Sequence, residues 1–198
     1  MISRAAGPKS ERLEQLRNLA KHLLIATEAR ALCDASRGVA WVLDFMFTLA
    51  CADCAGVNVE TGVNQLGFVS LYSPIGDDER GTYSAKSEYY GMLAFAQGSQ
   101  GQRVAVDCDA AGVNLTAYAV VRDQKRLSVT IINKDVSRDA DVRIAASEHL
   151  APANALRLTG PSLQSKDGVT LGGSAVTADG EWEPRALEPL RSKGGECE

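Results

Sequence analysis

The sequence predicts a mixed α and β fold in two parts, and three observations carry this prediction. Residues 40–50 are apolar nearly all round, as in a helix that other structure covers on most sides. Residues 57–59 have the pattern of a short buried strand, and residues 86–97 return to helical spacing. After Gly98, short strand-like segments alternate with polar turns. We therefore expect a helix–strand–loop–helix piece of an α/β barrel or doubly wound sheet, followed by an antiparallel β-sandwich.

Length and charge exclude several classes of protein. With 198 residues the chain is shorter than the roughly 250 residues of a complete (β/α)₈ barrel. The net charge is -4 and no basic stripe is present, so we expect no nucleic-acid partner. No apolar run is long enough to predict a membrane span. The polar N-terminus lacks a recognisable secretory signal, which leaves the localisation undetermined.

The cysteines do not indicate a disulfide scaffold or a metal centre. The chain has 5 cysteines, which are scattered, and 2 histidines. Cys51 and Cys54 form a C-x-x-C pair at the end of the apolar helix, without a second pair. We expect them to be buried thiols that pack in the core rather than metal or redox groups, and we expect no cofactor.

The N-terminal part of the chain offers one candidate catalytic residue. Leucines spaced on one helical face predict an amphipathic covering helix from Glu11. Residues 23–29 (LLIATEA) either end this helix or form the next strand. As a barrel strand, they would deliver Glu28 to the C-terminal rim, where barrel active sites lie. The alternative is an ordinary solvent-exposed glutamate in a helix.

Four segments in order carry a resemblance to an enzyme family. They are WVLDFMF at residues 41–47, GVN at 56–58, YSPI at 72–75 and EYYGMLAFAQ at 88–97. At these spacings the chain resembles the last barrel unit of the β-glucuronidase and heparanase-like glycoside hydrolases, family seventy-nine. The resemblance covers most of the chain after about residue 20 and continues through the β-rich tail.

The resemblance implies two domains. Residues 1–99 would be the C-terminal fragment of a (β/α)₈ glycosidase barrel, and residues 100–198 an antiparallel β-sandwich. The proline- and glycine-rich tail from Thr177 stops before a final strand, so we expect an unpaired sheet edge. Complete enzymes of the family are often exported.

The resemblance also implies a reaction. Retaining glycosidases cleave with a nucleophilic carboxylate that faces an acid/base carboxylate about 5–5.5 Å away. Thr27 and Glu28 match the family's nucleophile strand end, whereas Arg30 and Ala31 replace its Asn-Ser. The acid/base partner belongs to an earlier barrel strand that this chain lacks. We therefore expect a fragment that is inactive alone, with a glucuronide-type glycan and the missing N-terminal barrel segment as partners.

Three further residues are predicted to contact the substrate. Tyr72, in the YSP segment that shapes the sugar subsite of the family, could donate a hydrogen bond to a uronate carboxylate, or pack under its own loop. Glu60 stands near the place of the family's His-Gly pair and could bind a substrate hydroxyl, or cap the following turn. Asn64 is a weaker candidate for the same role.

Several local features have structural interpretations. We expect a solvated loop tip at Asp77 to Arg80 rather than a calcium site. Tyr89 and Tyr90 are predicted to be packing residues. Asn133-Lys134-Asp135 resembles the turn that satisfies backbone groups at a strand end in sandwich domains appended to glycosidase barrels. The predicted strands are residues 103–107, 115–121, 127–132, 141–145, 155–158 and 169–171.

Two other functions remain open at this point. The chain could be a non-catalytic β-sandwich module that binds carbohydrate or supports another chain, or a truncated gene product without activity. A sugar-stacking platform would favour the first, but past Gly98 only Tyr118 and Trp182 are aromatic.

Overall fold

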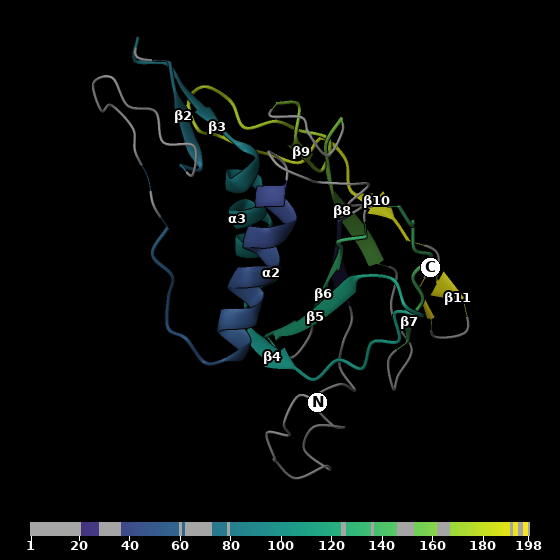
Figure 1. Cartoon of the computed structure of the whole chain (residues 1–198). Helices are drawn as coiled ribbons and strands as arrows, with labels where there is room; N and C mark the ends of the chain where they lie inside the picture. The colour runs from purple at the N-terminus through teal and green to yellow at the C-terminus, as the bar shows by residue number, and fades with distance from the viewer. Residues whose placement is uncertain are drawn as a thin grey trace.

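The protein has a mixed α/β fold in which two helices lie on one face of a sheet (Figure 1). The computed structural model describes residues 21–27, 37–59, 61, 73–78, 80–123, 126–135, 137–145, 153–161, 167–190, 192–193 and 196–197. The helices are α2 (Arg37–Cys51) and α3 (Ser87–Gly98), close to the ranges expected from their apolar spacing. Within the described residues, no helix is long and apolar enough to span a membrane.

The main sheet has seven strands in the order β10-β8-β1-β6-β5-β4, with β9 also pairing with β8. Strand β1 is parallel to both of its neighbours, and every other pair in this sheet is antiparallel. Its strands are β1 (Lys21–Thr27), β4 (Gln102–Val104), β5 (Leu115–Arg122), β6 (Arg126–Asn133), β8 (Ala153–Thr159), β9 (Thr170–Leu171) and β10 (Glu188–Pro189).

Two smaller sheets complete the described structure. Strands β2 (Ile75–Asp77) and β3 (Tyr83–Ala85) form a hairpin that leads into α3. A three-stranded antiparallel sheet has the order β11-β12-β7, from Ser192–Lys193, Glu196–Cys197 and Ile144–Ala145. Most of the predicted strands of the second half are present, but the segments at 103–107 and 141–145 form strands of only three and two residues.

Strand β1 decides between the two interpretations of residues 23–29. The sequence KHLLIAT is a strand, so the covering helix predicted from Glu11 does not extend into it, and its remainder lies outside the described residues. An almost continuous apolar run is typical of a strand with parallel neighbours on both sides. Its neighbours are β6 and β8, where Ile25 pairs with Thr130 and Leu24 with Ala155. The partners of β1 thus come from the β-rich second half.

The strand predicted at residues 57–59 is wrong. Residues 54–59 have no regular structure, and Asn58 is exposed. Three residues with a polar one in the middle can bury little apolar surface, and they pair with no strand in the described part of the chain. The path of the main sheet ends at β10 and β4 without these two strands pairing, so the described strands form an open sheet and no barrel.

The tail forms more structure than its composition indicates. The sequence predicts an unpaired edge after Thr177, but β10 lies in this tail and pairs with β8, which also pairs with β9. Arg157 of β8 forms an ion pair with Glu188 of β10. The tail also contributes β11 and β12 to the small sheet. Backbone N–H and C=O groups of these tail strands are therefore paired within sheets and are not left to bond with solvent.

One hydrophobic core joins the helices to the sheet. The two helices approach so closely that a Cβ on Gly91 would lie 2.4 Å from a Val42 methyl carbon and 2.5 Å from the Val39 carbonyl oxygen. This contact requires glycine in α3. The buried members of the core come from both sides of residue 99: Val39, Ala40, Leu43, Phe47, Tyr90, Ala94, Val120, Ile132, Leu156, Leu158, Val169 and Leu171.

The opposite face of the main sheet is also covered in part. Ala119, Ile131 and Ala155 point to this face, where Ile144 of β7 and Leu190 pack against them. The sheet therefore lies between a helical layer and a smaller β-layer, which is visible at the right of Figure 1.

Candidate functional site

The four predicted site residues lie outside the described residues. Glu28, Glu60, Asn64 and Tyr72 are in segments of which the structure describes nothing, so their roles stay predictions. The structure describes the element that precedes Glu28, because β1 ends at Thr27, the residue immediately before it.

The residues that follow Tyr72 are well anchored. Ser73 is buried, and its hydroxyl donates a hydrogen bond of 2.8 Å to the carbonyl oxygen of Ile75. The backbone N–H of Lys86 donates to the carbonyl oxygen of Pro74 at 2.9 Å. These bonds fix the start of the β2–β3 hairpin and bring its two ends together at the N-terminus of α3. The YSPI segment therefore has a defined position from Ser73 onwards.

A polar cluster lies between α2 and the main sheet, and we call it the Asp44 cluster. Asp44 Oδ1 accepts hydrogen bonds of 2.7 Å from both Thr116 Oγ1 and Tyr118 OH. Its Oδ2 accepts a hydrogen bond from Lys134 Nζ at 2.8 Å. Tyr118 OH also lies 3.2 Å from Thr48 Oγ1. The cluster therefore links helix α2 to β5 and to the residue that follows β6.

The ionisation of this cluster follows from burial and hydrogen bonding. Burial by itself would raise the pKa of Asp44, but the hydrogen bonds from Lys134, Thr116 and Tyr118 outweigh burial and lower it. Burial raises the pKa of Tyr118 to about 12, and the neighbouring Asp44 carboxylate adds to this effect. At neutral pH the Asp44 carboxyl is consequently ionised and the Tyr118 phenol is neutral.

The geometry indicates an anchor rather than a reactive group. Both carboxylate oxygens of Asp44 already accept hydrogen bonds, and the Lys134 ammonium is held by the carboxylate. The side chains of Lys134 and Asp44 are 26% and 22% exposed, which makes this a partly desolvated ion pair. A carboxylate of lowered pKa with all its partners in place is a poor general acid. The cluster therefore fixes α2 against the sheet.

Sequence reasoning missed the Asp44 cluster, although one signal was available. Asp44 is the only charged residue between Gly38 and Cys51, a stretch that is otherwise mostly apolar. A single carboxylate in a helix that packs in a core requires a cationic or hydrogen-bonding partner. The sequence did not reveal the identity of that partner, because Lys134 lies 90 residues away.

The Asn133-Lys134-Asp135 turn is structural, as predicted. Asp135 Oδ1 accepts hydrogen bonds from the backbone N–H groups of Ser137 and Arg138, both at 3.1 Å. The Asp135 N–H donates to Asn133 Oδ1 at 2.9 Å, and Asn133 Nδ2 donates to the Arg138 carbonyl oxygen. The Arg138 guanidinium beside Asp135 is the main reason that the pKa of this carboxyl is lowered. The turn thus satisfies the backbone where β6 ends.

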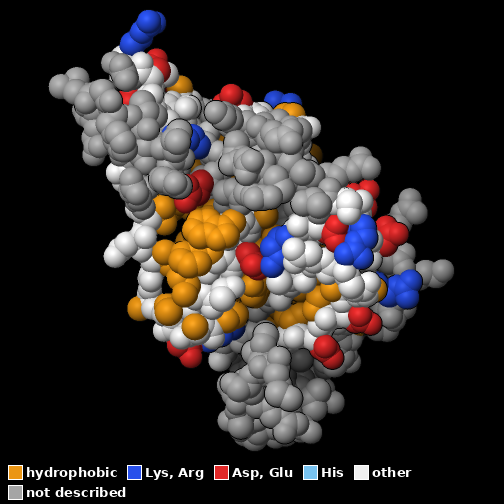
Figure 2. Space-filling view, in the orientation of Figure 1, with side chains coloured by type: hydrophobic (Ala, Val, Ile, Leu, Met, Phe, Trp, Pro, Cys, Tyr) orange, Lys and Arg blue, Asp and Glu red, His pale blue; other side chains and the backbone are white. Residues whose placement is uncertain are grey.

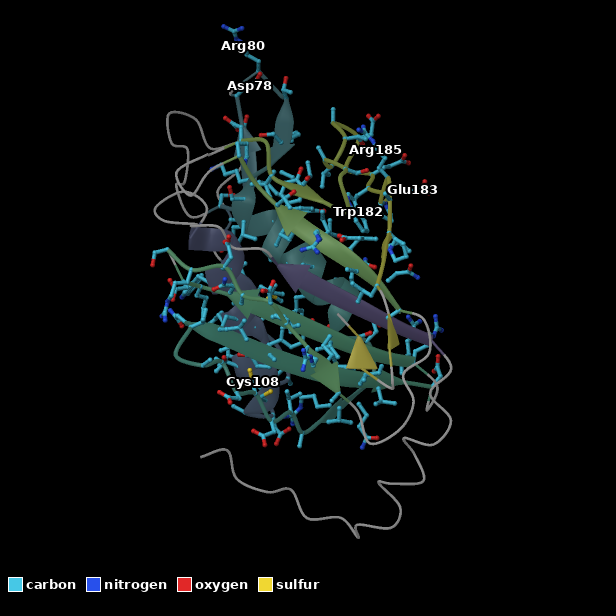
Figure 3. All side chains as sticks on the ribbon, turned by 90° about the vertical axis from the view of Figure 1, so that its right-hand side faces the viewer. Asp78, Arg80, Cys108, Trp182, Glu183 and Arg185 are labelled. Atoms are coloured by element: carbon cyan, nitrogen blue, oxygen red, sulfur yellow. The ribbon has the colours of Figure 1, made fainter. Side chains whose placement is uncertain are left out.

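Two residues of the predicted loop tip, Asp78 and Arg80, are exposed, whereas Asp77 is half-buried at the end of β2 and Glu79 lies outside the described residues. Asp78 and Arg80 lie at the far end of the β2–β3 hairpin, away from the sheet (Figure 3). Asp78 Oδ1 accepts hydrogen bonds from the N–H groups of Arg80 and Thr82, both at 2.9 Å, which closes the turn. Among the described residues, no three His, Cys, Asp or Glu side chains form a group that could hold a metal ion.

The described aromatic residues do not form a sugar-binding platform on the sheet. Tyr118 stacks on Phe47 with ring centroids 4.8 Å apart and faces the helices. Trp182 Nε1 donates a hydrogen bond of 3.0 Å to the Leu171 carbonyl oxygen, so its indole packs beside β9. Tyr90 is a packing residue, as predicted, and its hydroxyl accepts a hydrogen bond from the Val176 N–H.

The most exposed large hydrophobic side chain of the described residues belongs instead to α2. Trp41 is 57% exposed and stacks on Phe45 with ring centroids 5.0 Å apart. Figure 2 shows hydrophobic side chains gathered on the face of the molecule where α2 lies. The expectation that α2 is covered on most sides is therefore too strong, because one side of the helix is open.

The prediction of buried thiols is wrong. Cys51, Cys54 and Cys108 are all free and exposed. Helix α2 ends at Cys51, and Asp53 adopts a positive φ of 60°, which turns the chain away from the core. The helical spacing that predicted burial of Cys54 therefore no longer applies beyond Cys51.

Comparison with known proteins does not place the chain in a family. No protein-family model matches the sequence, and no curated protein sequence matches it.

Proposed function

We propose that this chain is the C-terminal part of a retaining glycoside hydrolase of the β-glucuronidase and heparanase-like type. When complete, the enzyme hydrolyses O-glycosyl bonds of β-glucuronides, and the chain alone is inactive. In the complete enzyme, residues 1–99 form the end of the catalytic barrel and residues 100–198 the appended β-sandwich. This division requires that β1 leaves β6 and β8 and pairs with barrel strands instead.

The observation that carries this proposal is the order of β1 and α2. A strand followed by a helix that packs on the same sheet is the repeating unit of α/β folds, and β1 is parallel to both of the strands with which it pairs. In such units catalytic residues follow the carboxyl ends of the strands. The residue after the carboxyl end of β1 is Glu28, the proposed nucleophile.

The lack of activity follows from the number of carboxylates that the reaction needs. A nucleophile at Glu28 requires a second carboxylate about 5–5.5 Å away as acid and base. In the family that the sequence resembles, this group belongs to an earlier barrel strand. The described strands form an open sheet, so a complete barrel requires strands from another polypeptide segment.

Sugar recognition is assigned to the loop between the two helices. We propose that Tyr72 contacts the uronate ring, and that Glu60 and Asn64 bind substrate hydroxyls. The anchored hairpin at Ser73 supports this assignment, because a rigid neighbour reduces the entropy that the loop loses on binding. No cofactor enters this reaction.

The test is complementation. The DNA upstream of this reading frame is searched for the missing barrel segment, the two segments are co-expressed, and hydrolysis of nitrophenyl β-glucuronide is measured. We expect hydrolysis by the pair, none by this chain alone, and loss of hydrolysis in Glu28→Gln. Glu181→Gln, at an exposed position, is the matched control and keeps full activity. Activity unchanged by Glu28→Gln would reject the nucleophile, and an inactive pair would reject the proposal.

One observation favours a second function, a non-catalytic support module. The core joins residues from α2, α3 and the sheet, so the described elements pack on one another. A module of this kind unfolds cooperatively when expressed alone and binds no glucuronic-acid polysaccharide in calorimetry. Because Tyr118 and Trp182 both pack inside the fold, the carbohydrate-binding form of this alternative has no aromatic platform on the described sheet.

A further inference from the structure

The C-x-x-C pair is chemically accessible. Cys51 and Cys54 are both free, and both are exposed together with Ala52 and Asp53 between them. An exposed thiol pair that is three residues apart does not fill a core, so the packing role expected from the sequence does not explain it. Solvent access is the first requirement for reaction of a thiol with a small disulfide.

The two cysteines lie on either side of a tight chain reversal. The Cys54 N–H donates to the Leu49 carbonyl oxygen at 3.0 Å, and the Asp53 N–H donates to the Ala50 carbonyl oxygen at 3.2 Å. With Asp53 in the left-handed region at φ 60°, these are the two bonds of a Schellman motif. The reversal folds Cys54 back over the last turn of α2, the turn that contains Cys51.

The reversal is held to the edge of the main sheet by one residue. Arg103 of β4 donates from Nη1 to the Cys51 carbonyl oxygen at 3.0 Å, and its Nη2 forms an ion pair with Asp53. We call these two contacts the Arg103 bridge. Strand β4 has three residues and only one partner, β5, in the described sheet. The bridge therefore adds to the few contacts that hold this edge strand.

We propose that Cys51 and Cys54 are a reversible dithiol–disulfide pair, and that their oxidation weakens the Arg103 bridge between α2 and β4. This inference is independent of the proposed glycosidase function. The oxidant is a small disulfide of the glutathione type. One cysteine thiolate attacks a sulfur of the oxidant, which breaks its S–S bond, forms a mixed disulfide and releases one thiolate.

The second step completes the reaction. The other cysteine thiolate attacks the protein sulfur of the mixed disulfide, forms the Cys51–Cys54 bond and releases the second small thiolate. The two cysteines together lose two protons and two electrons, and the small disulfide is reduced to two thiols. A small thiol present in excess reverses both steps.

The link to the Arg103 bridge is geometric. A disulfide holds the two Cβ atoms about 3.8 Å apart. In a Schellman motif the residue at the position of Cys54 tends to contact the residue at the position of Leu49, not that of Cys51. A shift of Cys54 towards Cys51 therefore changes the backbone of the segment from Cys51 to Asp53. Both partners of Arg103 belong to this segment.

The first experiment identifies the bond. The purified chain is equilibrated with reduced and oxidised glutathione in graded ratios, the remaining thiols are alkylated, and peptides are mapped by mass spectrometry. We expect a Cys51–Cys54 disulfide that disappears with excess reduced glutathione. Cys51→Ser and Cys54→Ser each accumulate the mixed disulfide at the remaining cysteine. Cys108→Ser is the matched control, because Cys108 is also free and exposed but is not part of the reversal, which ends at Cys54. This variant is expected to form the Cys51–Cys54 bond as the parent chain does.

The second experiment tests the structural consequence. Hydrogen exchange at the amides of residues 102–104 is expected to become faster on oxidation. Arg103→Ala already exchanges fast in the reduced state and shows no further increase, whereas Arg126→Ala, at an exposed position on β6, behaves like the parent chain. Independent glutathione adducts on both cysteines, or pairing of either with another cysteine, would overturn the disulfide. A Cys51–Cys54 bond without faster exchange would overturn the coupling to the bridge.

Discussion

Asp44 and Asp135 both have a lowered pKa, but they stabilise the fold in different ways. Asp44 accepts its hydrogen bonds from side chains 72, 74 and 90 residues away, on a different layer of the fold. Asp135 accepts most of its hydrogen bonds from groups two or three residues ahead, within its own turn. One carboxylate connects two layers, and the other shapes one turn.

The difference shows that local polar contacts stabilise a turn, whereas distant ones fix the position of one layer on another. The Asp135 turn can form without contacts to distant elements, because most of its hydrogen-bond partners are neighbours in sequence. The Asp44 cluster exists only when α2 lies against β5, so it contributes to the orientation of the helix on the sheet. The first kind of contact is visible in a sequence, and the second kind is not. Four experiments test this difference between the two aspartates.

The largest effect is expected for Asp44→Ala. The substitution leaves the Lys134 ammonium without its carboxylate in a partly desolvated position and removes the acceptor of two hydroxyl groups. We expect a loss of about 2 kcal/mol in the free energy of unfolding, below the range for fully buried pairs because the site is partly exposed. Urea denaturation measures this loss.

The control for this prediction is Asp78→Ala, since Asp78 is an exposed aspartate whose hydrogen-bond partners, Arg80 and Thr82, lie within its own turn. Equal destabilisation by the two substitutions would contradict the role of Asp44 between the layers.

A smaller and more local effect is expected for Asp135→Ala. The turn loses the acceptor for the N–H groups of Ser137 and Arg138, but these donors are near the surface and can bond to water. Hydrogen exchange should become faster at residues 133–138 while residues in α2 keep their protection. If α2 lost protection as well, the effect of Asp135 would not be confined to its own turn.

Acidification should lower the free energy of unfolding at each site by less than the corresponding alanine substitution does, because a protonated carboxyl still accepts hydrogen bonds. Both carboxyls have a pKa lowered below the usual value of 3.8, so they bind fewer protons in the folded than in the unfolded state. Their contribution to stability is present above this value and is lost as the pH falls through the folded-state pKa. Urea denaturation between neutral and strongly acidic pH measures it. The acid loss should be smaller in Asp44→Asn and in Asp135→Asn, and an unchanged acid profile in both would refute the assignment.

The smallest effect is expected for Tyr118→Phe. Asp44 keeps its bonds to Thr116 and Lys134, and the ring can still stack on Phe47, so we expect a loss of about 0.5 kcal/mol at neutral pH. The raised pKa of about 12 stabilises the fold below pH 10, and this contribution is lost as the pH rises towards 12. Urea denaturation at neutral and alkaline pH should therefore show a weaker alkaline loss for the variant. A loss as large as that of Asp44→Ala would mean that the phenol, not the ion pair, dominates the cluster.

Much of the secondary structure could be predicted, because it follows from short-range pattern. The apolar spacing of residues 40–50 and 86–97 predicts α2 and α3, and the alternation around residues 115–132 predicts β5 and β6. The strand at residues 57–59 failed because three residues carry too little pattern to show whether a pairing partner exists. The candidate site depended on a resemblance, and its four residues lie outside the part of the chain that the structure describes.

The two helices, most strands of the second half and the turn at Asp135 follow from the amino-acid sequence, since each depends on residues close together in the chain. Three features follow from long-range packing instead: β1 lies between β6 and β8, Lys134 pairs with Asp44, and Cys51 and Cys54 face solvent. These features depend on which distant surfaces meet, and local propensity carries no information about such contacts because burial is a property of the whole fold.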